Sequence, residues 1–151
     1  MSDAVMQQHD FQVLSAPEHV SVARRETAKV LGAWGLAEET VEIARLIVSE
    51  LVTNVVRHAA LLSPTAAVSL CHDGSHVTLS VADRHPHKPK ALQAAYGVGG
   101  RGLYLVRTLV EEVGGSHDVL PDRNTGGKSI VIRLPAPVPA RAGSTRRADL
   151  R

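Results

Sequence analysis

Apolar and polar residues alternate along the chain with two periods, a period of two that is typical of strands and a period of about 3.6 that is typical of helices. Residues 11–14 alternate and predict a short strand. The next residues, Ser15-Ala-Pro-Glu18, form a capping-box pattern with proline in the first turn, so we expect a helix from there to about Trp34. A second helix is predicted from about Glu38, where acidic side chains suit a helix N-terminus, to about Ala60.

Two further alternating segments predict a hairpin. Residues 67–71 and 77–81 flank Asp73-Gly74, a dipeptide that is typical of tight turns. The segment from Arg84 to Gly102 shows little periodicity and predicts a long loop. A loop of that length in a compact domain is usually a functional lid or disordered.

The last part of the ordered region predicts one helix and two strands. The helix covers residues 103–113, before Gly114-Gly115, and the strands are expected at residues 117–120 and 129–134. Strands that a hairpin joins pair antiparallel. The order of elements therefore predicts an α+β fold, a two-layer sandwich in which helices cover one face of a mixed or antiparallel sheet.

The chain is long enough for one ordinary domain, since it has 151 residues. We expect this domain to span residues 11–134. Residues 1–10 and the segment rich in proline, alanine and arginine at residues 135–151 are predicted to be disordered.

The basic character of the chain is a property of its C-terminal tail. Residues 135–151 carry four arginines and one aspartate, a net charge of +3, whereas the rest of the chain has 13 basic and 14 acidic residues, a net charge of −1. Aromatic residues make up only 3% of the chain, too few for the stacking platforms of RNA-binding domains. We therefore expect no direct binding to nucleic acid.

Cysteine content and hydropathy exclude several further classes of protein. Cys71 is the single cysteine, which excludes an internal disulfide and a cysteine-rich metal site. No apolar run approaches the roughly 18 residues that a membrane span needs, and residues 1–10 do not resemble a signal peptide. We expect a cytoplasmic protein that does not act at a membrane.

Polar residues one turn apart follow the border of the apolar stripe on the second predicted helix. Successive residues turn by about 100°, so Glu50, Asn54 and His58 fall within about 80° of one another. A carboxylate and an amide at the edge of a core are costly without partners, and this is the position where a helix would line a pocket. The row could instead be an ordinary polar edge with i,i+4 contacts. The exposed side of this helix is predicted to carry Glu42, Arg45, Ser49 and Thr53.

Two more features could contact a ligand. Asp83 ends a predicted strand, where it could accept a hydrogen bond from an amino group of a ligand or simply begin a turn. Residues 97–102 read Gly-Val-Gly-Gly-Arg-Gly before a predicted helix, and open backbone N–H groups at a helix N-terminus suit a phosphate chain. The same pattern occurs in dinucleotide-binding Rossmann domains, but residues 88–96 do not form the preceding strand that such a site needs.

Taken in order, these features resemble the Bergerat-fold (GHKL) ATPases and kinases, and most closely the small single-domain bacterial anti-sigma-factor serine kinases and their regulatory relatives. The order is Glu-x-x-x-Asn on a helix, an aspartate at a strand end, a loop, and Gly-x-Gly before a helix. Three stretches carry the likeness, at residues 48–59, 99–106 and 127–134. The resemblance covers about residues 11–134, almost everything outside the termini.

The resemblance implies roles for individual residues. Asn54 would ligate a Mg²⁺ that bridges the phosphates of ATP, which an amide oxygen can do. Glu50 would be the general base that orients or deprotonates an attacking serine hydroxyl. Asp83 would be the carboxylate that recognises adenine, and Ser129 stands where the family often has a threonine near the adenine.

The glycine-rich segment would hold the phosphates, and residues 84–98 would be the ATP lid. Arg101 could contact a phosphate or point to solvent. The residues that we assign to this phosphate-binding turn are Gly99, Gly100, Arg101, Gly102 and Leu103.

By the same resemblance, the chain would be a Mg²⁺-dependent protein serine/threonine kinase that binds ATP and controls a transcription factor. Its expected partners are a sigma factor and an anti-sigma antagonist that carries the acceptor serine. The kinase is expected to act as a homodimer.

One departure from the family leaves a second function open. The adenine-binding box of the family commonly reads Asp-x-Gly, whereas residues 83–87 read Asp-Arg-His-Pro-His, without glycine. A bulkier residue at His85 could weaken nucleotide binding. The alternative is a non-catalytic regulator that binds ATP, or nothing, and acts by sequestering a partner. A third interpretation, the catalytic half of a two-component histidine kinase, would need a helical hairpin with an acceptor histidine, for which residues 1–10 leave no room.

Overall fold

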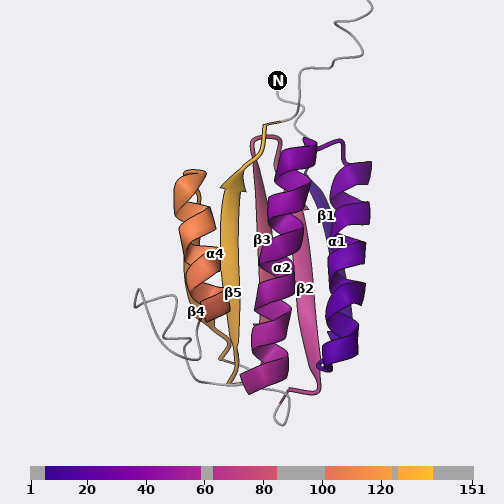
Figure 1. Cartoon of the computed structure of the whole chain (residues 1–151), viewed down its shortest axis with the longest axis vertical. Helices are drawn as coiled ribbons and strands as arrows, with labels where there is room; N and C mark the ends of the chain where they lie inside the picture. Colours follow the sequence, from indigo (N-terminus) through magenta and orange to yellow (C-terminus); the bar gives the residue numbers. More distant parts are fainter. Residues whose placement is uncertain (1–5, 59–62, 85–100, 124–125, 138–151) are drawn as a thin grey trace, which may run out of the picture.

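A computed structural model describes residues 6–58, 63–84, 101–123 and 126–137 of the chain. Its strands form a sheet, and its helices pack on one face of that sheet (Figure 1). The elements in chain order are β1 (Gln7–Leu14), the 3-10 turn η1 (Pro17–His19), α1 (Val20–Ala33), α2 (Glu38–His58), β2 (Thr65–His72), β3 (His76–Asp83), α4 (Arg101–Glu112), β4 (Ser116–Pro121) and β5 (Lys128–Pro135). None of the described helices is long and apolar enough to cross a membrane.

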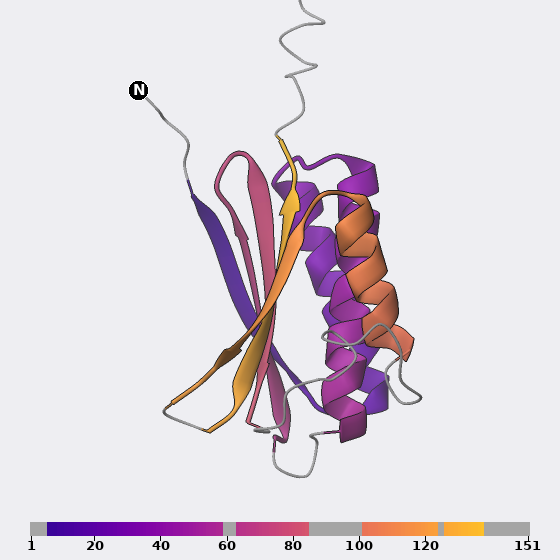
Figure 2. The same ribbon diagram turned by 90° about the vertical axis from the view of Figure 1, so that its left-hand side faces the viewer.

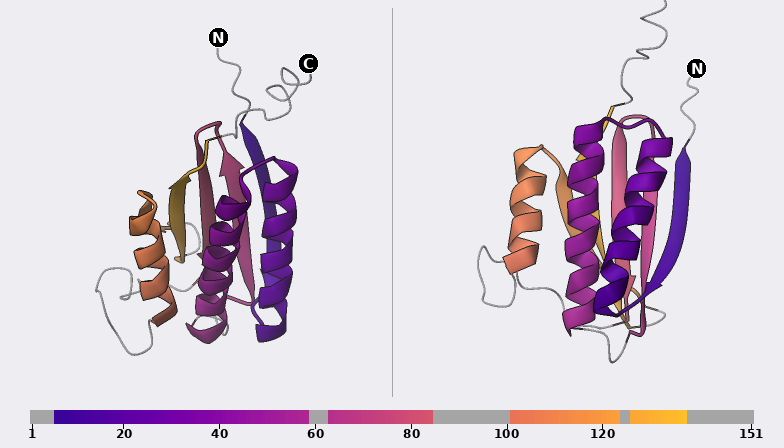
Figure 3. Two further views of the ribbon diagram at one scale, coloured as in Figure 1. Left: turned by 45° about the horizontal axis from the view of Figure 1, so that its top comes forward. Right: turned by 45° about the vertical axis from the view of Figure 1, so that its right-hand side comes forward.

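The sheet has the strand order β1-β2-β3-β5-β4, and every neighbouring pair is antiparallel. The helices lie together on one side of it, as Figure 2 shows from the edge and Figure 3 from two oblique directions. The predicted α+β sandwich is therefore confirmed. Of the two sheet types that the sequence allowed, the antiparallel one is present.

The core lies between the sheet and the helices because alternate residues of the central strands point toward the helices. In β2 and β3 every second residue is buried, as the period of two in the sequence predicts. Burying one such aliphatic side chain stabilises the fold by roughly 1.5–3 kcal/mol. The largest fully buried aliphatic side chains are Leu31, Ile47, Leu51, Leu70, Leu79, Ile130, Ile132 and Leu134.

The first strand is longer than the sequence suggested. It begins at Gln7, which pairs with His72 of β2, so residues 7–10 are ordered, contrary to expectation. The backbone groups of residues 7–10 form hydrogen bonds with β2, and the alternating pattern, which began only at Phe11, did not indicate this pairing. Residues 1–5 and 138–151 of the predicted disordered ends lie outside the described residues.

The predicted capping box at Ser15 is wrong. The Ser15 hydroxyl donates to the carbonyl oxygen of Ser63, at 2.7 Å, and the turn η1 that precedes α1 has no side-chain cap. The Ser15 backbone N–H also donates to a distant carbonyl, that of Pro64, at 2.9 Å. The Ser15 side chain therefore bonds to a residue that is distant along the chain and does not cap the helix.

Ser49 is buried, although the helical wheel put it on the exposed side of α2. Its hydroxyl oxygen lies 3.4 Å from Nη1 of Arg24, which donates to it from α1. Figure 1 shows α2 between α1 and α4, so α2 is covered by α1 as well as by the sheet. A helical wheel that assumes a single buried face does not predict the second buried face of α2, which packs against α1.

The hairpin between β2 and β3 is fixed by the side chain of Asp73. Its Oδ1 accepts hydrogen bonds from the backbone N–H groups of Ser75, at 2.9 Å, and His76, at 2.8 Å, and from the Ser75 hydroxyl, at 3.1 Å. These bonds, led by the one from the Ser75 N–H, hold the pKa of Asp73 well below its usual range, and the nearby Arg133 guanidinium adds to the effect. The ionised carboxylate thus stabilises the turn.

We predict that Asp73→Asn lowers the thermal unfolding temperature at pH 7. A lowered folded-state pKa contributes stability that is present above the unfolded value of about 3.9 and is lost as the pH falls below it. The difference between wild type and variant should therefore shrink from pH 7 toward pH 2 in melts followed by circular dichroism. Asp118→Asn, an exposed aspartate in β4, is the control. A deficit of the same size at both pH values would contradict the prediction.

Candidate functional site

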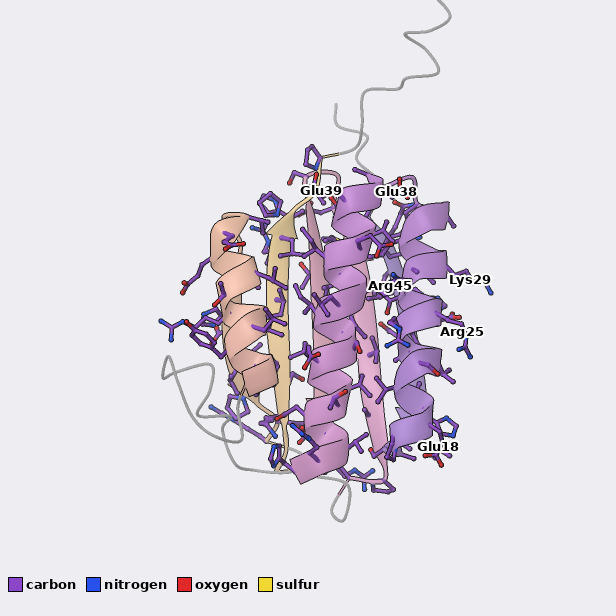
Figure 4. The ribbon with its side chains drawn as sticks, in the orientation of Figure 1. Glu18, Arg25, Lys29, Glu38, Glu39 and Arg45 are labelled. Atoms are coloured by element: carbon purple, nitrogen blue, oxygen red, sulfur yellow. The ribbon has the colours of Figure 1, made fainter. Side chains whose placement is uncertain are left out.

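Most of the residues that the sequence singled out lie at one end of the molecule. Figure 1 shows that α2 and β3 end there, and that α4 and β5 begin there. This brings together Asn54 near the end of α2, Asp83 at the end of β3 and Arg101 at the start of α4. The opposite end of α2 carries Glu38 and Glu39, which Figure 4 shows far from this site.

Glu50 and Asn54 form a half-buried polar row on α2, as predicted. Ser49 contacts α1, and Glu50 and Asn54 lie about 100–140° around the helix from it. They therefore lie on the flank that faces away from α1, toward α4 (Figure 1). Neither side chain forms a hydrogen bond or ion pair with another described residue. Their polar atoms are thus available to a ligand, whereas His58 of the same row is exposed.

Asp83 is paired with a lysine that the sequence analysis did not consider. Lys128 is its direct neighbour in the antiparallel ladder between β3 and β5, and both side chains point to the helix-covered face. The Lys128 Nζ donates to Oδ1 at 3.0 Å and to Oδ2 at 2.9 Å. The side chains are only 1% exposed for Asp83 and 6% for Lys128. A carboxylate so deeply buried needs a cation beside it, and Lys128 supplies one.

Gly127 allows the two strands to approach each other at this point. A Cβ at this position would overlap the carbonyl oxygen of Asp83 and the Cα of Arg84. The preceding turn is closed by Gly126, which has a φ of +80°, and by a 2.9 Å bond from the Asp122 N–H to the Gly127 carbonyl. Only glycine can therefore place Lys128 opposite Asp83 without moving a strand.

Ser63 fastens the chain where it leaves the end of β3. Its hydroxyl accepts the backbone N–H of Arg84 at 3.0 Å and donates to the carbonyl of Thr65 at 2.8 Å. Its own carbonyl accepts the Ser15 hydroxyl. Ser63 is buried and thus connects three strand ends beside Asp83. Sequence reasoning missed this role, because Ser15 and Arg84, two of its partners, are far away along the chain.

The other predicted site residues are placed as follows. Arg101 and Gly102 form the first turn of α4, and the Leu103 side chain is buried beneath it. Ser129 pairs with Ala82, so its side chain points to the uncovered face of the sheet, away from Asp83. Gly99, Gly100, His85 and the predicted lid at residues 85–98 lie outside the described residues.

A magnesium ion would need ligands from a nucleotide as well as from the protein. Among the described residues, no three histidine, cysteine, aspartate or glutamate side chains form a cluster that could hold a metal. Mg²⁺, however, usually keeps several waters and takes one or two protein oxygens together with phosphate oxygens. The half-buried amide of Asn54, without a partner among the described residues, fits that limited role.

Comparisons with known proteins identify the family and the fold. The profile of a family described as histidine kinase-like ATPase domain matches residues 13–134. The chain is 27% identical over 119 residues to the serine-protein kinase RsbW of Oceanobacillus iheyensis, covering 69% of this chain and 75% of that protein. It is 28% identical over 119 residues to the serine-protein kinase RsbW of Bacillus subtilis, covering 69% and 74%. A solved structure, the SiaB–SiaC complex of Pseudomonas aeruginosa, has a similar fold, with a TM-score of 0.52 and 14% identity over 84% of this chain and 89% of the matched chain.

We predict that Lys128→Met lowers the free energy of unfolding by about 3 kcal/mol, because it leaves a buried carboxylate without its cation. Urea denaturation would measure the change. The double variant Asp83→Leu with Lys128→Met should regain most of the loss, since an apolar pair needs no compensation.

The matched control for this experiment is the exposed ion pair of Arg107 and Glu111, 3.1 Å apart on α4. Arg107→Met should cost at most about 0.5 kcal/mol, since exposed pairs on a helix contribute little. An equally small loss for Lys128→Met would show that Asp83 does not depend on the pair.

Proposed function

The chain belongs to the family of histidine kinase-like ATPase domains, and from this premise we propose that it binds ATP and transfers the γ-phosphoryl group to a serine of a regulatory partner protein. One observation carries the proposal. The end of α2 that carries Asn54, the end of β3 with Asp83 and the N-terminus of α4 lie at the same end of the fold, and Glu50 is one turn further along α2. The similarity to proteins named serine-protein kinases supports the choice of acceptor.

The proposed nucleotide site uses three kinds of group. Asn54 supplies the amide oxygen that would hold Mg²⁺ together with the phosphates. The first turn of α4, which contains Arg101, would offer its backbone N–H groups and a positive helix end to the phosphate chain. Asp83 accepts the exocyclic amino group of the base. We do not include Ser129, because its side chain lies on the other face of the sheet.

Glu50 would handle the proton of the acceptor serine. It lies one turn before Asn54 on the same flank of α2. The γ-phosphoryl group of ATP supplies the electrophile, and Glu50 accepts the hydroxyl proton as the serine oxygen bonds to phosphorus and ADP leaves. A half-buried carboxylate without a partner among the described residues is suited to this task, since no other described group competes for its lone pairs.

The biological role that we propose is that of an anti-sigma factor in the cytoplasm. The kinase would hold a sigma factor inactive and phosphorylate an antagonist protein, whose serine decides when the sigma factor is released. A homodimer is part of the proposal, as in the family that the sequence resembles.

A specific observation also favours the non-catalytic alternative. The carboxylate expected to bind adenine already has a lysine on both of its oxygens, and residues 83–87 lack the usual glycine. A regulator that sequesters a partner without phosphotransfer would tolerate both features. The next two experiments separate these functions.

We predict that Asn54→Ala weakens ATP binding at least about tenfold in the presence of Mg²⁺ and changes it little in EDTA, because the variant loses the metal ligand alone. Isothermal titration calorimetry measures both conditions. Thr53→Ala, the neighbouring polar residue on α2, is the control. Equal Mg²⁺-dependent affinities for Asn54→Ala and wild type would contradict the metal role, and no binding by wild type at millimolar ATP would leave only the partner-binding function.

We predict that Glu50→Gln lowers the rate of phosphate transfer by about 10²–10⁴-fold while the dissociation constant for ATP changes less than about threefold. The assay follows labelled phosphate from ATP to an antagonist protein recovered with the kinase. Glu42→Gln, an exposed glutamate on the same helix, should keep wild-type activity. If wild type binds ATP and the antagonist but transfers no phosphate, the non-catalytic regulator replaces the kinase.

A further inference from the structure

The ion pair of Asp83 and Lys128 stands where the proposed function puts the recognition of the base. The further inference rests on that function and concerns which purines the site accepts. A lone aspartate would present a net negative charge to the base. Here the carboxylate and the ammonium are in direct contact, at 2.9 and 3.0 Å, so the pair as a whole is neutral.

A base that contacts the Asp83 carboxylate also comes close to the Lys128 ammonium, because the two groups are in direct contact. The Lys128 Nζ is within 3.0 Å of both carboxylate oxygens. A donor atom that binds either oxygen at an ordinary distance of about 2.9 Å therefore lies within about 6 Å of the ammonium. In a buried setting, charges at that distance act on each other strongly, because little water screens them.

The two partners prefer different purines. Adenine carries an amino group at position 6, a donor that the carboxylate accepts, whereas guanine carries an oxygen there, which only accepts hydrogen bonds. An unpaired carboxylate repels that oxygen. A neighbouring ammonium attracts it and also favours N7, a ring nitrogen that is an acceptor in both bases.

We infer that Lys128 is a specificity-determining residue of the nucleotide site, which admits 6-oxopurine nucleotides beside ATP. Asp83 recognises an amino group at position 6, and Lys128 compensates the charge that would exclude an oxygen there. The close approach at Gly127 keeps the two side chains in register, so the base meets them as one unit.

The experiment compares the dissociation constants of ATP and inosine triphosphate, measured by calorimetry at one fixed Mg²⁺ concentration. These nucleotides differ in the base at position 6, amino in one and oxo with a proton on the ring nitrogen in the other. For wild type we expect inosine triphosphate to bind less than about tenfold more weakly than ATP. A preference for ATP above tenfold would overturn the inference, because sites built around one hydrogen-bonding group discriminate far more strongly.

Two variants test the sign of each partner's contribution. Lys128→Met should increase the preference for ATP by at least about tenfold, and Asp83→Asn should shift the preference toward inosine triphosphate. A merely structural role of the pair would move both nucleotides together in both variants, and that result would overturn the inference. Circular dichroism checks that each variant is folded, and if Lys128→Met is not, the wild-type ratio and Asp83→Asn decide.

The outcomes also separate the inference from the function on which it depends. If wild type binds ATP and rejects inosine triphosphate, the proposed nucleotide site is supported, but the inference that Lys128 determines purine specificity is wrong. If wild type binds neither nucleotide, the proposed function fails and the inference fails with it. Thr53→Ala, outside the proposed base site, should keep the wild-type ratio.

Discussion

Helix α2 packs against the sheet, α1 and α4, and this constraint determines what the rest of the site can be. Leu51, Val52 and Val55 are buried, and Ser49 is closed off by Arg24 of α1. A rotation of the helix by one residue, about 100°, would expose apolar side chains that each stabilise the fold by roughly 1.5–3 kcal/mol. Glu50 and Asn54 thus lie on the flank toward α4, and the packing of the buried side chains fixes the direction of that flank.

The antiparallel ladder gives the second fixed element of the site. Asp83 and Lys128 are separated along the chain, yet they are direct neighbours because β3 and β5 pair in one register. A slip of that register by one residue would turn Lys128 to the uncovered face and separate it from Asp83. Gly127 and the Ser63 hydroxyl hold the strand ends against such a shift. Core packing fixes the helix side of the site, and hydrogen bonds and charge fix the sheet side.

The sequence predicted what depends on local periodicity and missed what depends on distant partners. The row of Glu50 and Asn54 follows from a period of 3.6 and could be placed on one flank from the sequence alone. Lys128 could not be recognised, because its role exists only when β5 pairs with β3. A lysine on the buried face of an alternating strand was the available signal. Ser15 was misjudged for the same reason, since its hydroxyl binds Ser63 in place of a local cap. The family resemblance supplied roles for residues, which periodicity cannot do.

The buried ion pair is hard to explain by stability alone. Two charges taken out of water cost several kcal/mol each, and apolar residues of similar size often serve the fold as well or better. At the end of a strand that faces the helix layer, an apolar pair would simply extend the existing core of Val81 and Ile130. We therefore regard the charged pair as part of the proposed binding site and not as a purely structural contact. In the proposed nucleotide site, the sequence at residues 83–87 and the presence of Lys128 would both affect how the base is contacted.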